Sequence, residues 1–169
     1  MSSTQQKDQA TKLAKQNPRK ALERARNISN PWYKAQALSW VTRYTDGDPL
    51  SVAREAEQAA SSCNDDYKRT AVRAWEVAAL AERGLVDEAR KILMSVLSQQ
   101  KSVTPLSSRS EALILLLHAS FRIGMSEAKL VVTELKSACG NDSHWRCKRA
   151  IKDANKLLTE EMKPRPFYW

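Results

Sequence analysis

Apolar residues recur along most of this chain at every third or fourth position, which is the spacing of one face of an α-helix. On residues 65–83 the apolar residues form one stripe along the helix. Charged side chains such as Arg69, Arg73 and Glu76 fall on another face. The members of this stripe are Tyr67, Ala71, Ala74, Ala78 and Ala81. We therefore expect an all-α protein.

Signals for the beginning of a helix recur along the chain. Prolines at positions 18, 31, 49 and 105 each follow an Asn, Asp or Thr. A capping side chain before a proline is typical of the first turn of a helix. The expected helices, about nine in all, are 3–16, 18–28, 31–45, 49–62, 65–83, 86–100, 105–123, 126–139 and 143–162. Because every connection is short, we expect successive helices to be antiparallel neighbours.

Glycine is scarce, and each of the four glycines lies where one helical pattern stops and the next begins. Gly84 is the clearest case, since it interrupts a run of good helix formers in the stretch ERGLVDEARKI. A left-handed residue after the last turn commonly closes a helix. We expect all four glycines to have this role.

Four of the expected helices begin alike: YKAQA (33–37), YKRTA (67–71), SRSEA (108–112) and WRCKRA (145–150). Each has an early basic residue and an alanine three or four positions after it. Their leading residues are separated by 34, 41 and 37 residues. The intervening helices carry alanines at a similar period, so the pattern indicates a repeat of two helices.

The segments GLVDEARKIL, beginning at Gly84, and GMSEAKLVV, beginning at Gly124, each run from the turn of a helix pair into its second helix. Their turn glycine and following small residue resemble the tetratricopeptide-repeat-like (TPR-like) family of helical hairpins. The resemblance covers roughly Pro18 to Leu158. It implies an α-α superhelix, a solenoid whose first helices line a concave surface. We expect residues 1–162 to form this single repeat domain.

Residues 163–169, with the sequence KPRPFYW, form a tail of different composition. Its two prolines stop the last helix after Met162, and three consecutive aromatic residues follow. Such a tail either folds back to cover the exposed end of the helical stack or forms an extended docking peptide. We expect the other tryptophans, Trp32, Trp40, Trp75 and Trp145, to pack between repeats.

The chain has a formal net charge of +9, with 28% charged and 42% hydrophobic residues. The excess of positive charge is greatest at the two ends, with +5 for residues 1–28 and +3 for residues 141–169. Such a distribution indicates either solvated helix faces or contact with an acidic partner.

Basic residues that recur near helix starts, or on the polar faces of the first helices, are the candidate binding residues. A cation near a helix start is mildly unfavourable, by roughly 0.3 to 1 kcal/mol, because it opposes the helix dipole. Its recurrence suggests either ion pairs with loop carboxylates such as Asp65, Asp66 or Asp142, or a ligand-binding ladder. The candidate groove residues are Lys34, Arg43, Lys68, Arg69, Arg73, Arg109, His118, Arg122, Arg146 and Arg149.

Candidate metal and catalytic residues are few. Cys139, His144 and Cys147 are close in sequence, but a structural zinc needs four ligands and the repeat pattern places Cys63 too far away. We expect three thiols and neither a metal nor a cofactor. Among the motifs of known enzymes, no nucleophile elbow, phosphate-binding loop or H-E-x-x-H pattern occurs. His118 lies among leucines and is expected to be a satisfied or half-exposed helix residue rather than a general base.

These features predict a non-enzymatic module that binds a protein or an acidic peptide in a mainly cationic groove. The alternative is a single-stranded nucleic acid bound along the basic repeat surface. We expect no membrane association, since ALILLLHASF at 112–121 is about half of the roughly 20 residues that a span requires. We expect a cytoplasmic protein, because the N-terminus does not resemble a signal peptide. The oligomeric state stays open.

Overall fold

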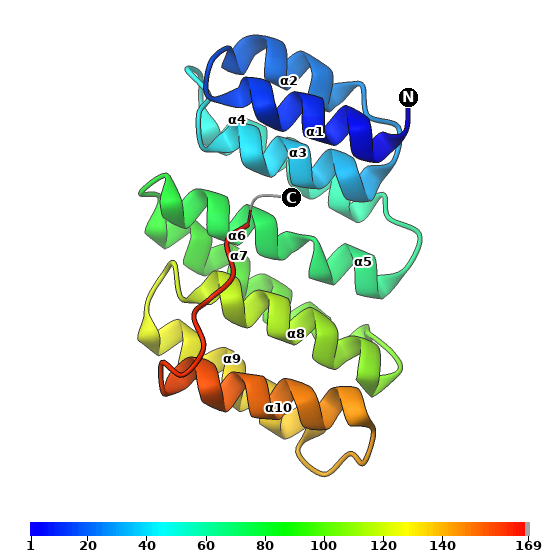
Figure 1. The fold of residues 1–169 in the computed structure, drawn as a ribbon, viewed down its shortest axis with the longest axis vertical. Helices are drawn as coiled ribbons and strands as arrows, with labels where there is room; N and C mark the ends of the chain where they lie inside the picture. The colour runs from blue at the N-terminus through cyan, green and yellow to red at the C-terminus, as the bar shows by residue number, and fades with distance from the viewer. Residues whose placement is uncertain (168–169) are drawn as a thin grey trace.

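The protein is described here by a computed structural model that covers residues 1–167, all of it helical or loop (Figure 1). The all-α expectation is confirmed for these residues. Its elements are α1 (Ser3–Ala14), α2 (Pro18–Arg26), α3 (Pro31–Thr42), α4 (Pro49–Ser61), α5 (Asp66–Ala71), α6 (Arg73–Glu82), α7 (Val86–Gln99), the 3₁₀ segment η1 (Gln100–Ser102), α8 (Leu106–Ser120), α9 (Met125–Cys139) and α10 (Trp145–Leu158).

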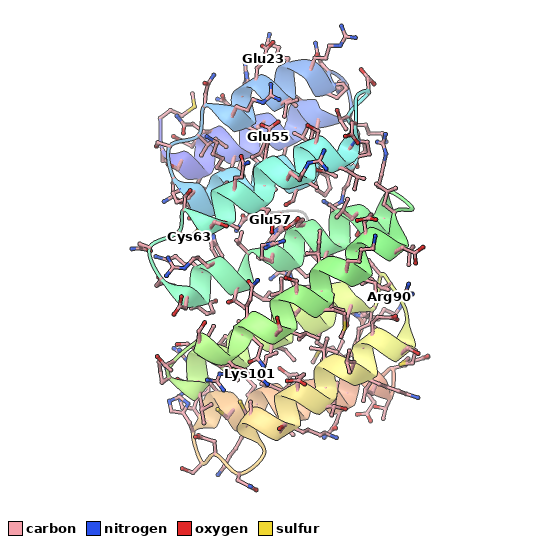
Figure 2. All side chains as sticks on the ribbon, turned by 180° about the vertical axis from the view of Figure 1, so that it is seen from behind. Glu23, Glu55, Glu57, Cys63, Arg90 and Lys101 are labelled. Atoms are coloured by element: carbon pink, nitrogen blue, oxygen red, sulfur yellow. The ribbon has the colours of Figure 1, made fainter. Side chains whose placement is uncertain are left out.

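The helices form two layers that follow the chain in alternation. Neighbours along the chain pack as hairpins, namely α1 with α2, α3 with α4, α6 with α7 and α8 with α9. The first members of these hairpins also contact one another, and α10 joins them beside α8 (Figure 1). Figure 2 shows the molecule from the opposite side, where α4, α7 and α9 lie towards the viewer. We call the side of α3, α5, α6, α8 and α10 that faces the viewer in Figure 1 the front face.

Three of the four expected helix starts at proline are confirmed. Side-chain oxygens of Asn17, Asn30 and Asp48 accept hydrogen bonds from backbone N–H groups at 3.0 Å, and proline occupies the first turn. The expectation for Thr104 is wrong. Pro105 has extended backbone, so α8 begins one residue later, at Leu106, without a side-chain cap.

The helix expected over residues 65–83 is divided at Val72 into α5 and α6. Here the N–H of Trp75 donates to the carbonyl of Val72 at 3.1 Å, a bond across three residues instead of four. This tighter turn interrupts the α-helical ladder. The apolar period of the sequence continues through the interruption and therefore does not reveal it.

Gly84 has the conformation expected of it, with φ at 88°. The N–H of Leu85 donates to Leu80 at 2.9 Å and that of Gly84 to Ala81 at 3.0 Å, which together close α6. The same expectation is wrong for the other three glycines, because none has a positive φ in the left-handed region. Their helices end without a left-handed residue.

Alanine and leucine dominate the core between the layers. Ala74, Ala78 and Ala79 of α6 and Leu113 and Leu116 of α8 are fully buried. Small side chains let helix backbones approach closely, and the leucines fill the remaining space. No helix within residues 1–167 is long and apolar enough to cross a membrane.

Replacing Gly84 by alanine is expected to lower the free energy of unfolding by about 1 to 2 kcal/mol, because an L-residue with a Cβ is strained in the left-handed region. A Cβ at Gly84 would meet no other atom within 4 Å, so the loss comes from the backbone alone. Chemical denaturation followed by circular dichroism measures it.

Gly47→Ala is the matched control. Its φ is not in the left-handed region, and the nearest side-chain atom would lie 3.8 Å from a new Cβ. Its effect should stay within about 0.5 kcal/mol. Equal losses for the two variants would show that the conformation of Gly84 does not matter.

Candidate functional site

The ten candidate binding residues fall into two regions of the stack. Arg43, Arg73, His118 and Arg122 belong to the central part, where α3, α6 and α8 pack side by side. The other six are Lys34, Lys68, Arg69, Arg109, Arg146 and Arg149, which lie near the starts of α3, α5, α8 and α10. We call this second region the helix-start edge.

In the central part, carboxylates neutralise the arginines. Glu82 accepts from Arg43 Nε at 2.5 Å with one oxygen and from Arg122 Nε at 3.3 Å with the other. The Arg43 side chain is only 6% exposed. A buried charge is tolerated when it is paired and hydrogen-bonded. These cations therefore contribute little free positive charge to the front face.

Arg73 links two helices through two carboxylates. Its side chain, 8% exposed, contacts Glu76 of α6 and, at 3.1 Å, Glu57 of α4, which is labelled in Figure 2. Burial raises the pKa of Glu76 to about 7, while the contact with Arg73 acts in the opposite direction. Arg73 thus holds α6 against α4 and is directed into the packing between the layers.

The C-terminal tail lies across the central part of the front face (Figure 1). From the end of α10 it passes α8 and reaches α6, where Phe167 is 1% exposed. The ring of Phe167 meets that of Trp75 edge to face, with centroids 5.3 Å apart. The tail therefore neither covers the end of the stack nor projects as a free docking peptide. Residues 168 and 169, which complete the expected aromatic triplet, lie outside the described part.

Side chains of α8 hold the tail by its backbone. The N–H of Arg165 donates to Nδ1 of His118 at 3.1 Å, and Arg122 donates to the carbonyl of Arg165 at 2.9 Å. The Arg165 guanidinium lies over the rings of Trp75 and Phe167, 5.4 Å from each centroid. Sequence patterns did not indicate these contacts.

His118 is well suited to accept a hydrogen bond. Burial, together with the nearby Arg165 and Arg122, lowers its pKa to about 4, whereas Asp153 acts in the opposite direction. At neutral pH the imidazole is therefore uncharged and keeps an acceptor nitrogen for the tail.

The helix-start edge contains an open cavity of about 540 Å³ between the starts of α3 and α5. Trp32 and Tyr67 form part of its wall, and their rings are stacked with centroids 6.3 Å apart. Lys68 and the amides of Asn30 and Asn64 also line it. The cavity therefore combines aromatic surface with polar and cationic groups.

A second cavity, of about 440 Å³, lies on the other side of Tyr67 and reaches α10. Trp145 is 58% exposed here, so the expectation that it packs between repeats is wrong. The guanidinium groups of Arg146 and Arg149 lie 5.4 and 5.0 Å from its ring centroid. Trp145 starts α10, the last helix, and no later hairpin covers it within residues 1–167.

The cations of the edge differ in how strongly they are already engaged. Lys68 pairs with Asp65 at 3.3 Å, Arg69 with Asp66 at 3.0 Å and Arg149 with Glu111 at 2.8 Å. Arg109 donates to the carbonyls of Val103 and Lys101 at 3.0 and 2.6 Å. Within residues 1–167, the side chains of Lys34 and Arg146 make neither an ion pair nor a hydrogen bond.

An aromatic column connects the two regions. Tyr67 stacks on Trp32, Trp32 meets Trp75 edge to face at 5.8 Å, and Trp75 meets Phe167. Three of the four repeated segments open with an aromatic residue. One of these residues, Tyr67, forms the end of the column that lies at the helix-start edge. No local pattern indicated that Phe167 would complete the column.

Two of the cysteines, Cys139 and Cys147, line neither cavity of the edge, whereas Cys63 lines the first one. Cys63, Cys139 and Cys147 are buried free thiols, and Cys139 lies beside Cys147. Burial and this neighbour raise the pKa of Cys139 to about 12, so its thiol stays protonated. Exposed His144 caps α10 by accepting from the N–H of Arg146. In the described part of the chain, no group of three His, Cys, Asp or Glu side chains is arranged to hold a metal ion.

No model of a known protein family, no curated protein and no solved structure matches this chain.

Lowering the pH is expected to weaken the attachment of the tail. The pKa of His118 is lowered in the folded state relative to an ordinary value of about 6.5, so the folded protein binds fewer protons between these two values. This contribution to stability is full above pH 6.5 and is lost as the pH falls towards 4.

Urea denaturation of the wild type and of His118→Asn, from pH 7 to pH 4, tests this expectation. Asparagine keeps an acceptor oxygen close to the position of Nδ1 but does not titrate. The wild type should lose stability relative to the variant as the pH falls. Parallel pH profiles would show that the histidine does not control the tail.

Proposed function

We propose that the chain is a TPR-like α-α superhelical repeat protein and acts as a non-enzymatic interaction module. In this proposal it binds an acidic segment of a partner protein in the cytoplasm. The binding surface is the helix-start edge, between the starts of α3 and α10. Repeated two-helix units and their layered packing support the architecture.

The observation that carries the proposal is the cavity between Trp32 and Tyr67. Its volume of about 540 Å³ is within the range of ligand sites, and it stays open while the tail occupies the centre of the front face. Burying one large apolar side chain there would contribute roughly 1.5 to 3 kcal/mol to binding.

Free cationic groups indicate the charge of the ligand. Arg146 is exposed and unpaired within the described residues, and it lies at the second cavity beside Trp145. A guanidinium binds a carboxylate through two parallel hydrogen bonds. An extended peptide with an aromatic side chain in the first cavity and a carboxylate at Arg146 would use both features.

Single-stranded nucleic acid is the second candidate. Exposed Trp145 and the cations around it resemble the stacking surfaces that bind such strands. However, Asp65, Asp66 and Glu111 lie among these cations and pair with three of them. These carboxylates would repel a phosphate backbone, so the edge fits a peptide with a few carboxylates better than a polyanion with one charge per residue.

We expect Arg146→Glu to weaken the binding of acidic peptides about tenfold, equivalent to about 1.4 kcal/mol, because an attractive charge becomes repulsive. The probes are fluorescent peptides in which one Phe or Tyr is flanked by Asp and Glu, with oligothymidine of similar length for comparison. Anisotropy titrations at several salt concentrations measure both affinities.

Lys148→Glu is the matched control, since Lys148 is exposed on the same helix and lines neither cavity. It should leave the peptide affinity unchanged. An equal loss in both variants would mean that only net charge matters. Tight oligothymidine binding that falls steeply with salt would instead favour the nucleic-acid function.

A further inference from the structure

The segment 163–167 occupies the front face in the manner of a bound peptide. It is extended, and its two prolines restrict φ and so reduce the conformational entropy lost on binding. Its backbone is held by His118 and Arg122, while Phe167 and Arg165 supply side-chain contacts. Backbone hydrogen bonds together with one or two side-chain pockets are a common mode of peptide recognition.

We propose that the front face of α6 and α8 is a second binding site, which accepts an extended Arg-Pro-aromatic peptide from a partner protein in exchange for the chain's own tail. The site is distinct from the helix-start edge, and its ligand is cationic where the ligand of the edge is acidic. Residues 163–167 act as an intramolecular ligand that competes with the partner.

The contacts define the chemistry of this ligand. The aromatic residue fills the space beside Trp75, whose side chain is nearly buried. An arginine two positions earlier lies over the same indole, where a planar cation gains from the ring electrons. The backbone of that arginine must present an N–H to His118 and a carbonyl to Arg122.

A closed turn separates α10 from the tail. Glu160 lies between the end of α10 and the tail with φ at 61°, the only non-glycine residue with a positive φ in the described part. Such a conformation is strained for a residue with a Cβ. The N–H of Met162 donates to the carbonyl of Lys156 at 3.1 Å across this turn, so α10 is closed before the tail begins and residues 163–167 can leave the front face without unwinding the helix.

The front face also has hydrogen-bonding capacity that the described part of the tail does not use. Ser39 Oγ and Arg43 Nη2 of α3 and Trp75 Nε1 of α6 are buried without a hydrogen-bond partner. Buried polar atoms are normally paired, so such groups call for an explanation. A partner peptide that continues from α6 towards α3 offers carbonyl groups for these donors.

The test adds a labelled, acetylated and amidated Lys-Pro-Arg-Pro-Phe peptide to the full-length protein and measures anisotropy. In Phe167→Ala the chain's own tail is weakened, and the apparent affinity should rise by about tenfold or more if the tail fills the site at least about 90% of the time. Lys163→Ala is the control, since Lys163 is exposed and should leave the affinity at the wild-type value.

Arg165→Ala provides a second weakened tail in case Phe167→Ala does not fold, and circular dichroism checks both variants. A peptide with alanine in place of phenylalanine should not bind. Failure of the unchanged peptide to bind either folded variant would overturn the proposal. A wild-type dimer that the Lys-Pro-Arg-Pro-Phe peptide dissociates in ultracentrifugation would assign the site to a second copy and also overturn it. Neither result affects peptide binding at the helix-start edge, which Arg146→Glu reports separately.

Discussion

The arrangement of the front face depends on the contacts that the indole of Trp75 makes. Trp32 meets it from the helix-start edge, while Phe167 and Arg165 meet it from the tail. Because α6 lies in the middle of the stack (Figure 1), this one side chain joins the beginning of α3 to residues 165–167 of the tail. Aromatic contacts of this kind contribute about 0.5 to 1.5 kcal/mol each beyond the burial of their surface.

Charge pairing decides which parts of the surface remain available to partners. A net charge of +9 suggests an acidic partner, but the arginines in the centre of the front face are paired with Glu57, Glu76 and Glu82. Their positive charge is neutralised by ion pairs that connect the helices. The helix-start edge keeps cations that are exposed or unpaired, above all Arg146. A count of charges in the sequence cannot separate these two roles, because it contains no information on burial.

Local signals predicted the helices well. Asn17, Asn30 and Asp48 cap the helices expected of them, and Gly84 closes α6 in the left-handed conformation. The division at Val72 escaped prediction, since the apolar period runs through it. Thr104 also failed as a cap, because Pro105 stays outside the helix. Such errors arise where tertiary packing overrides local preference.

The candidate site was predicted less completely. Recurrence of a basic residue at helix starts identified Lys68 and Arg146 at the edge cavities, and the leading aromatics Tyr67 and Trp145 lie beside them. Burial of Arg43 and Arg73 was missed, as was the exposure of Trp145. The position of the tail was also missed. Two prolines predict where α10 stops, but only contacts between distant segments place Phe167 on Trp75.

The most direct test of this account is a nuclear Overhauser experiment between the ring protons of Phe167 and the indole protons of Trp75 in the full-length protein. With ring centroids 5.3 Å apart, strong cross-peaks are expected. Their absence, together with random-coil chemical shifts for residues 163–167, would show that the tail does not occupy the front face.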